Sequence, residues 1–226
     1  MSTDGKRLSL SQCPCETEAD EELLLPIPAL KELSRLLSGG DRDKRVEVLY
    51  DGSTAWFRID GVEFSIRRVE SSFPNYEKIL TSDVLTTLRI QREEFLSALE
   101  RIDIIARNTV AHLVVMQLSP GGDLKMTTRA PDFGMALEVL DANIDGNPLR
   151  VGFNVGYLQD GLRALGTGEV LVEFNGEEGQ TRIVQDGADN FLYMLMPARL
   201  SPQDILEDDN EEENDDNGAS GAEATS

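Results

Sequence analysis

Short apolar segments separated by turns rich in Gly and Asp run through most of the chain. Phe191 to Leu200 reads F-L-Y-M-L-M-P-A-R-L, an apolar run that Pro197 ends because proline cannot donate a hydrogen bond to a sheet. Apolar residues on both faces indicate either a strand deep in a core or a strand with one face open as a ligand pocket. The pattern therefore predicts a final strand at Phe191 to Met196, around which the rest of the fold is organised.

Three segments carry apolar residues at positions i, i+4 and i+7, the spacing of a helix with one buried face. Glycines follow the first and third segments, and Asn154 is a favourable N-cap for the third. The predicted helices are Pro28 to Leu37 (Ala29, Leu33, Leu36), Arg92 to Ala106 (Phe95, Leu99, Ile102) and Asn154 to Leu165 (Leu158, Leu162, Leu165).

Each predicted helix lies in a βαβββ unit, with one strand before the helix and three after it. Asp-Gly turns separate several of these strands, and the Asp4-Gly5 turn near the start predicts the second half of a hairpin whose first strand is missing. Such repetition predicts an α+β fold with helices on one face of curved antiparallel sheets. The predicted strands are Leu23–Pro26, Val46–Tyr50, Thr54–Ile59 and Val62–Arg68; Thr86–Ile90, Leu113–Ser119, Leu124–Thr128 and Met135–Ala142; Leu149–Phe153, Val170–Phe174, Thr181–Val184 and Phe191–Met196.

The distribution of charge distinguishes the C-terminal tail from the rest of the chain. The 226 residues include 21 basic and 42 acidic side chains, a net charge of −21, and ten of the acids lie in Ser201 to Ser226, which has no Lys or Arg. Its composition predicts a disordered, solvated tail that either screens anionic partners or only aids solubility. The acidic body argues against nucleic-acid binding unless a local basic face exists.

Such a face is available on the predicted helices. Lys31 and Arg35 are i, i+4 neighbours on the first helix, Arg101 takes the equivalent position on the second, and Arg163 lies near it on the third. Ordinary solvated helix residues are the alternative interpretation.

Residues for catalysis or metal binding are scarce. Cys13 and Cys15 are the only cysteines and His112 is the only histidine, so a four-ligand zinc site is not supported and two thiols in a reducing compartment are expected. His112 precedes an apolar strand, where a structural role is more common than catalysis. No glycine loop has the lysine of a phosphate site. We therefore expect no enzyme activity, catalytic residue, cofactor or metal, and, without an apolar run of membrane length, a cytoplasmic protein.

Five motifs follow one another along the chain. They are T-D-G-K-R-L at Thr3–Leu8, E-L-S-R-L-L-S-G-G at Glu32–Gly40, F-P-N-Y at Phe73–Tyr76, G-F-N-V-G-Y-L at Gly152–Leu158 and Y-M-L-M-P-A-R-L at Tyr193–Leu200. Together they resemble the bacterial sliding clamp, the β subunit of DNA polymerase III. The family has two βαβββ units per domain and three domains per subunit. The resemblance implies residues 1–84 as part of a second domain with a linker, 85–200 as a third domain and 201–226 as the acidic tail.

The resemblance implies a processivity factor that encircles duplex DNA as a homodimeric ring. It is loaded by a clamp loader and tethers DNA polymerase III, repair factors and other proteins with clamp-binding motifs, which would make it nucleoid-associated. Lys31, Arg35, Arg101 and Arg163 would face the DNA phosphates without reading sequence. Ile104 and Ile105 would lie at the subunit interface.

A peptide-binding pocket between the second and third domains is also implied. A Met-rich apolar floor suits several related peptides, although Met194 or Met196 would be core if it faced inward. Lys6 replaces a histidine that is common in the family, and the first domain and half of the second have no counterpart in this chain. The alternative function is therefore a stand-alone peptide-binding module that does not encircle DNA. The implied pocket residues are Thr3, Gly5, Lys6, Arg7, Leu8, Pro74, Lys78, Ile79, Asn154, Tyr157, Met194, Leu195, Met196, Pro197, Ala198, Arg199 and Leu200.

Overall fold

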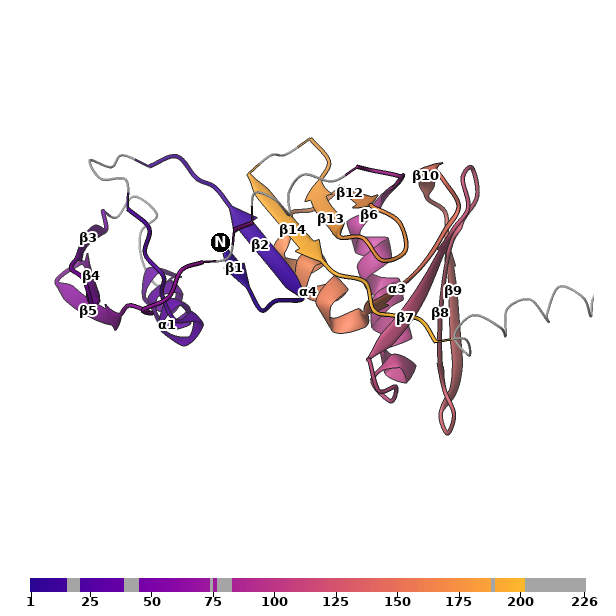
Figure 1. Ribbon diagram of the computed structural model, residues 1–226, viewed down its shortest axis with the longest axis horizontal. Helices are drawn as coiled ribbons and strands as arrows, with labels where there is room; N and C mark the ends of the chain where they lie inside the picture. Colours follow the sequence, from indigo (N-terminus) through magenta and orange to yellow (C-terminus); the bar gives the residue numbers. More distant parts are fainter. Residues whose placement is uncertain (16–20, 39–44, 74, 77–82, 188–189, 202–226) are drawn as a thin grey trace, which may run out of the picture. The chain divides into compact units, whose positions relative to one another are not determined.

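The chain divides into two compact units in a computed structural model (Figure 1). The structure describes residues 1–201 except for 16–20, 39–44, 74, 77–82 and 188–189. The smaller unit is Pro14–Leu80, and the larger unit combines Met1–Cys13 with the chain from Thr81 onward. Met1–Cys13 thus groups with the C-terminal part of the chain, whereas its assignment to a second clamp domain stays a prediction.

The described part of the smaller unit contains one helix and one three-stranded antiparallel sheet. Alternate residues of the central strand are buried, as the period of a strand with one covered face requires. They pack with Leu33 of the helix, which the helical spacing placed on its apolar face. The elements are α1 (Ile27–Ser38), β3 (Glu47–Tyr50), β4 (Thr54–Ile59) and β5 (Val62–Arg67), in the sheet order β3-β4-β5.

The strand predicted at Leu23–Pro26 is wrong. This segment has no strand structure, and its backbone makes one hydrogen bond toward the end of β5, from Val69 N to Leu24 O at 2.9 Å. Pro26 and Pro28 lack the N–H groups that further ladder bonds need, which explains why the pairing does not extend.

Within its described residues, the larger unit has two antiparallel sheets and two long helices that lie side by side (Figure 1). Its sheets have the orders β1-β2-β14-β13-β12-β6-β10 and β11-β7-β8-β9. The elements are β1 (Ser2–Thr3), β2 (Arg7–Ser11), β6 (Thr86–Gln91), α3 (Arg92–Ala106), β7 (Leu113–Leu118), β8 (Leu124–Ala130), β9 (Gly134–Leu140), β10 (Asn143–Gly146), β11 (Leu149–Asn154), α4 (Val155–Ala164), β12 (Glu169–Phe174), β13 (Thr181–Gln185) and β14 (Phe191–Leu195).

One continuous core joins the helices to both sheets of the larger unit. Phe95, Leu99 and Ile102 of α3 are fully buried in it, as the i, i+4, i+7 spacing predicted. Phe153 of β11 and Phe174 of β12 lie with ring centroids 6.3 Å apart, so aromatic packing links the two sheets. The α+β fold and the bounds of α3 are confirmed.

Two details near Asp-Gly turns differ from the predictions. The Asp145-Gly146 pair was predicted as a turn but lies at the end of β10 (Asn143–Gly146), which pairs with β6 and buries Ile144. An Asp-Gly pair marks the end of a strand as well as a turn, so the signal does not separate the two. Near the start of the chain, Ser2–Thr3 pairs with β2, so the hairpin has a short first strand and is not missing one.

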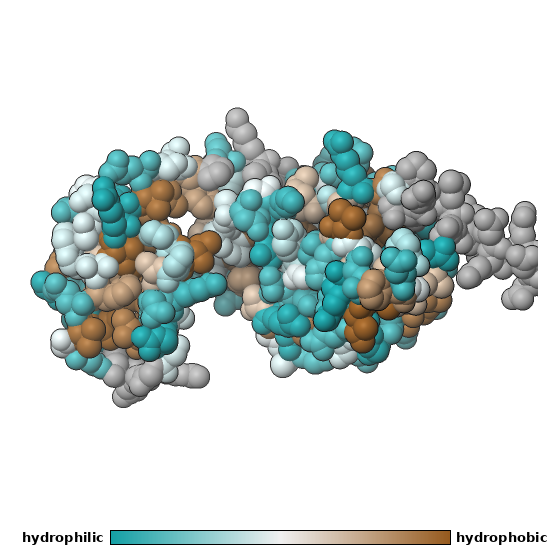
Figure 2. Space-filling view, turned by 90° about the horizontal axis from the view of Figure 1, so that it is seen from below, coloured by the Kyte–Doolittle hydropathy of each residue, from teal (hydrophilic) through white to brown (hydrophobic). Residues whose placement is uncertain are grey.

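Apolar side chains also remain at the surface of both units. In the smaller unit, Val48, Leu49, Tyr50 and Val62 are 37–50% exposed along the two outer strands of the sheet. Brown apolar surface is visible over the left part of the molecule in Figure 2. Among the described residues, no helix is both long and apolar enough to cross a membrane.

Candidate functional site

The strands β2 and β14 bring the two ends of the described chain together. They pair antiparallel, with Leu8 opposite Met194 and Arg7 opposite Leu195. The pairing continues for one more bond, in which Met196 N donates to Lys6 O at 2.9 Å. Pro197 follows immediately and cannot donate, so the strand ends there.

The apolar residues of these strands divide into a buried and an exposed set. Leu8, Met194 and Leu195 are 7%, 3% and 1% exposed and belong to the core, whereas Met196 is 46% exposed. The alternation of a strand ends with β14 at Leu195, so Met196 is free to turn outward. Of the two methionines, Met196 is therefore the one that a ligand can contact.

The segment after β14 crosses the neighbouring sheet at Gly152. Ala198 N donates to Gly152 O at 2.8 Å, and the two residues form an isolated bridge. A Cβ atom on Gly152 would lie 2.5 Å from Leu200 Cδ2 and 3.2 Å from the carbonyl oxygen of Ala198. Only glycine lets the C-terminal segment approach β11 this closely.

Asn154 fixes the start of α4. Its Oδ1 accepts from Tyr157 N at 3.1 Å, the N-cap bond that the sequence predicted, and its Nδ2 donates to Ala111 O at 3.0 Å. The same side chain thus satisfies a free N–H of the first helical turn and holds the turn before β7. Tyr157 takes its place beside β2 as a result.

Arg7 is the most connected polar residue of this region. Its guanidinium lies 4.2 Å from the centroid of the Tyr157 ring, Nη1 is 2.7 Å from Asp160 Oδ2, and Nε is 2.9 Å from Asp4 Oδ2. Nη1 also lies 3.5 Å from the hydroxyl of Tyr193, which itself donates to Tyr157 O at 2.9 Å. One cation therefore ties β2, the start of α4 and β14 together.

Partial burial does not neutralise this cation. Burial by itself lowers the pKa of Arg7, but hydrogen bonds with Asp160, Tyr193 and Asp4 outweigh it and raise the pKa above its ordinary value. For Asp4, burial raises the pKa, but the hydrogen bonds from the Arg7 side chain and from the backbone N–H groups of Lys6 and Arg7 together outweigh it and lower the pKa. Burial also raises the pKa of Tyr193. The cluster therefore holds a permanent positive charge next to a neutral phenol.

The turn between β1 and β2 holds Lys6 at the surface. Thr3 Oγ1 donates to Arg7 O at 2.7 Å and accepts from Gly5 N at 3.2 Å, and Lys6 N donates to Asp4 Oδ1 at 3.0 Å. Gly5 has a φ of 85°, in the left-handed region that favours glycine. These bonds hold the backbone of the turn, and Lys6 is exposed.

Fourteen of the predicted pocket residues lie in this region of the larger unit, on β1, β2, the start of α4 and the segment from β14 to Leu200. Pro74, Lys78 and Ile79 lie outside the described residues. Three residues that hold the region together were not predicted as site residues: Asp4, Asp160 and Tyr193. Tyr193 is the first residue of the Y-M-L-M-P-A-R-L motif, so the motif could have suggested it. Asp160 is three residues after Tyr157 on the same helix face, so helical spacing could have suggested it.

A family model of the C-terminal domain of the DNA polymerase III beta subunit matches residues 77–199, more than half of the chain. The chain belongs to the DNA polymerase III beta subunit family. The beta sliding clamp of Synechocystis is 27% identical over 212 residues, which are 88% of this chain and 54% of that protein. The beta sliding clamp of Staphylococcus aureus strain Mu50 is 28% identical over 200 residues, which are 87% of this chain and 52% of that protein.

Solved structures of the family agree with the fold. A sliding clamp of Pseudomonas aeruginosa bound to griselimycin matches with a TM-score of 0.81 and 26% identity, over 88% of this chain and 53% of that one. The beta subunit of Thermotoga maritima matches with a TM-score of 0.81 and 25% identity, over 88% of this chain and 54% of that one. The chain thus spans about half the length of the sliding clamps that it matches.

The residues expected to face DNA are exposed, and three of them form ion pairs. Arg101 makes two bonds of 2.7 Å to Glu138 on β9, Arg163 lies 3.0 Å from Glu100, and Arg35 lies 3.0 Å from Glu32. Lys31 is exposed on α1. Since α3 packs on α4, Arg101 and Arg163 belong to one helical layer, whose exposed face carries acids as well as bases.

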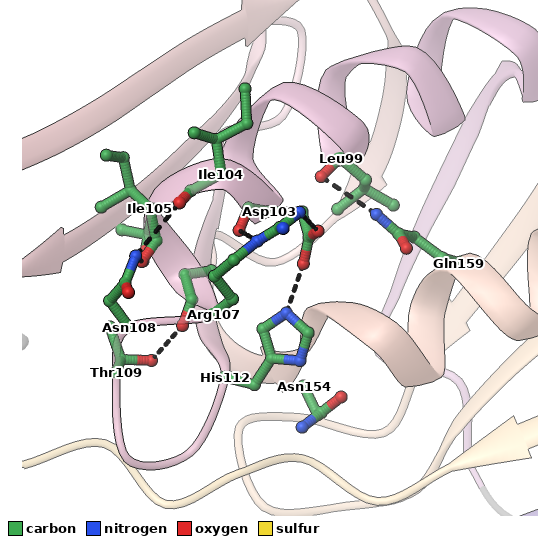
Figure 3. Close-up of polar contacts among 12 residues, drawn as sticks. Leu99, Asp103, Ile104, Ile105, Arg107, Asn108, Thr109, His112, Asn154 and Gln159 are labelled. Atoms are coloured by element: carbon green, nitrogen blue, oxygen red, sulfur yellow. Dashed lines mark hydrogen bonds and ion pairs between the residues drawn. The ribbon is translucent and has the colours of Figure 1, made fainter.

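The residues expected at a clamp interface lie at the end of α3. Ile104 is 62% exposed, and Ile105 is half-buried. Figure 3 shows the neighbouring network, in which His112 Nε2 and Arg107 both contact the carboxylate of Asp103. Burial raises the pKa of Asp103, but hydrogen bonds from His112 and Arg107 outweigh it and lower the pKa.

This network connects two helices. His112 has a φ of 52°, and its carbonyl oxygen accepts from Val155 N at 2.9 Å, at the start of α4. The contact with Asp103 therefore connects the end of α3 to the start of α4, as expected for a structural histidine.

A separate cavity of about 540 Å³ lies away from these residues, between the ends of β6 and β10 and the turn at Gly121-Gly122. Glu94, Asp123 and Asp141 are among its lining residues. The described part of the chain holds no cluster of His, Cys, Asp or Glu suited to a metal ion.

Proposed function

We propose that this chain is part of a sliding clamp that holds peptide segments of its partners on the surface formed by β2, β14 and the start of α4. The partners are DNA polymerase III and other proteins with clamp-binding motifs. Membership of the DNA polymerase III beta subunit family supports this proposal. So does the similarity to sliding clamps, although this chain matches only about half of their length.

The arrangement around Arg7 is the observation that carries the proposal. A fixed cation, the exposed Lys6 and the ring of Tyr157 form a polar rim beside Met196, whose unbranched side chain adapts to different apolar partners. Convergent polar groups beside an adaptable apolar residue suit an extended peptide with an apolar anchor.

Griselimycin provides a defined probe, since it is bound in the structure of the Pseudomonas aeruginosa relative. We expect fluorescently labelled griselimycin to show saturable binding to this chain by fluorescence anisotropy. Removal of Arg199 and Leu200 from the full chain is expected to weaken binding, because Leu200 anchors the segment on Gly152. Equal binding with and without these two residues would contradict the proposed location.

The second part of the proposal is the ring. Within a complete clamp, which a clamp loader would open and a second subunit would close, Lys31, Arg35, Arg101 and Arg163 would contact the phosphates of duplex DNA without sequence preference. The edge strand β9 and Ile104 and Ile105 would contribute to the subunit interface. The ion pairs of three of these arginines make such contacts weak and sensitive to salt.

A ring encircles DNA, whereas the alternative, a stand-alone peptide-binding module, does not. The alternative gains support from the fact that every described pocket residue lies in one compact unit. In a sedimentation assay with the clamp loader, a ring stays on circular DNA in high salt and leaves when the DNA is cut. Griselimycin binding without such retention would favour the module.

A further inference from the structure

The larger unit contains one structural repeat twice, a strand followed by a helix and three further strands (Figure 1). The first repeat is β6-α3-β7-β8-β9, and the second is β11-α4-β12-β13-β14. The first strand of each repeat pairs with the strand that follows the helix of the other repeat, since β6 pairs with β12 and β11 pairs with β7. With α3 packed on α4, each repeat therefore extends the sheet and covers the helix of the other.

The described part of the smaller unit contains this repeat once. Its helix and three strands are α1, β3, β4 and β5, and residues 23–25 precede the helix. Leu24 O accepts a hydrogen bond from Val69 N, just after β5, at 2.9 Å. In the larger unit Gly152 O accepts from Ala198 N, just after β14, at 2.8 Å. Leu24 and Gly152 each lie three residues before the first residue of their helix, so residues 23–25 take the place of a first strand.

Two strand edges that are paired in the larger unit are open in the described part of the smaller one. β3 lies at the edge of its sheet, whereas its counterparts β7 and β12 each have a first strand beside them. Leu23 and Leu25 both pack on the core, which is the alternation of an extended segment. Because the carbonyl of Leu24 points to Val69, the backbone groups of Leu23 and Leu25 point to the opposite edge. Pro26 faces the same edge as Leu24, so its missing N–H takes no donor from the open edge.

Side chains beside the open edge of β3 lie on the core face of the sheet and are nevertheless exposed. Val48 lies opposite Phe57, and Tyr50 lies opposite Ala55, both of which are buried in the core. Val48 and Tyr50 themselves are 42% and 37% exposed. Their counterparts on β7 and β12 are 0–1% exposed; these are Val114, Met116, Val170 and Val172.

The helix α1 shows the same difference. Leu30, its fourth residue, is 38% exposed, whereas the fourth residues of α3 and α4, Phe95 and Leu158, are 0% and 1% exposed. Leu37, the eleventh residue of α1, is 43% exposed, and its counterpart Ile102 on α3 is fully buried. The helix and the sheet of the smaller unit are therefore both uncovered where the larger unit has a second repeat.

We propose that two copies of this chain pair through their smaller units, with residues 23–25 of each copy beside β3 of the other. One unit carries both open edges, so its surface is self-complementary, as an interface with two-fold symmetry requires. The reciprocal pairing of the two repeats in the larger unit is the template for this exchange. The pairing is independent of the peptide site and of the ring contact proposed at β9 and Ile104.

The register of the exchange follows from the larger unit. There, the residue before each helix lies opposite the first residue of the partner strand, as Gln91 lies opposite Glu169. The same register places Leu24 of one copy opposite Leu49 of the other. The apolar pairs that result are Leu25 with Val48 and Leu23 with Tyr50. The sequence supports the comparison of β3 with β12, because Glu47-Val48-Leu49 repeats Glu169-Val170-Leu171.

Sedimentation velocity of the full chain over a series of concentrations is the first test, and we expect a dimer that dissociates on dilution. Leu30→Lys combined with Val48→Lys is expected to weaken the dimer at least about tenfold in Kd. Both side chains are exposed in the single chain, so the variant should fold. Equal fluorescence of Trp56, the only tryptophan, in dilute variant and wild type checks that the smaller unit is intact.

The matched control is Ile104→Lys combined with Val139→Lys, two exposed residues at the proposed ring contact. This variant should keep the dimer of the wild type. Dissociation by the control variant, and not by the variant of the smaller unit, would overturn the proposal and assign the dimer to the ring contact. A wild-type monomer at every concentration would also overturn it and assign the face to another occupant, such as a further repeat of a longer chain.

A disulfide cross-link tests the register itself. In a Cys13→Ser, Cys15→Ser background, Leu24→Cys combined with Leu49→Cys is expected to give a covalent dimer on oxidation, because residues opposite each other in antiparallel strands lie within disulfide reach. Leu24→Cys combined with Val62→Cys, on the other edge strand β5, should stay monomeric on a non-reducing gel. Equal cross-linking of both pairs, or cross-linking of neither, would overturn the proposed pairing.

Discussion

The guanidinium of Arg7 lies over the ring of Tyr157, 4.2 Å from its centroid, and these two residues are 150 positions apart in the sequence. Asp160 and Asp4 hold the guanidinium from its edges. The site is thus preorganised by a residue that has one local partner, Asp4, and two partners, Tyr157 and Asp160, that only the tertiary structure supplies.

Replacement of Arg7 by Lys is expected to destabilise the larger unit by about 1 kcal/mol, because a lysine keeps the charge but not the planar fork that serves both carboxylates and the ring. Native-state hydrogen exchange at the amides of β13 and β14 measures the change locally. Trp56, the only tryptophan, lies in the smaller unit and would not report it. Arg199→Lys, at an exposed position, is the control, and equal exchange in both variants would contradict the role of Arg7.

Gly161 is expected to tolerate no larger residue while Tyr193 is present. A Cβ atom there would lie 2.4 Å from Tyr193 Cδ1, so Gly161→Ala should destabilise the unit by about 1–3 kcal/mol through overpacking. In a Tyr193→Ala background the same change should stabilise α4 by up to about 1 kcal/mol, since Ala is the better helix former. An effect of the same sign in both backgrounds would refute the predicted contact.

The sequence predicted helices and strands well where a single local signal, such as helical spacing or an N-cap residue, determines them. The spacing of Phe95, Leu99 and Ile102 located α3 with its correct bounds, and Asn154 located the cap of α4. Propensity failed at Leu23–Pro26, because a strand also needs N–H donors along a partner strand and this segment contains proline.

The site residues were predicted from the resemblance of motifs. The contacts that these residues make with one another could not be predicted from the sequence. Nothing in the sequence near Arg7 shows that Asp160, 153 residues away, is its partner, because only the pairing of β2 with β14 brings α4 into reach. Likewise, the basic positions Arg101 and Arg163 were visible, whereas their partners Glu138 and Glu100 depend on how α3 packs against β9 and α4.

Glu138 is expected to give the larger unit a pH-dependent stability. Its hydrogen bonds from Arg101 lower the pKa of the carboxyl below its ordinary value of 4.5, with burial opposing them. A carboxyl with a lowered folded-state pKa stabilises the fold above pH 4.5, and this contribution is lost as the pH falls through the folded-state value.

The variant Glu138→Gln should therefore be less stable than the wild type at neutral pH, by about 0.5–1 kcal/mol for a pair this exposed. The difference should shrink as the pH falls below 4.5. Hydrogen exchange at β8 amides over a pH series, corrected for intrinsic exchange, measures it. Arg101→Gln should remove the same dependence, and a difference that persists at low pH would assign the effect to another group.

The central claim, that partners bind beside β2 and β14, is tested most directly with two methionines. Met196 and Met135 are each 46% exposed, but only Met196 lies at the proposed site. We expect Met196→Ala to weaken binding of labelled griselimycin by about 1–2 kcal/mol, roughly five- to thirtyfold in Kd. Met135→Ala should leave the Kd unchanged. Equal affinities of the two variants, or a loss only with Met135→Ala, would contradict the account.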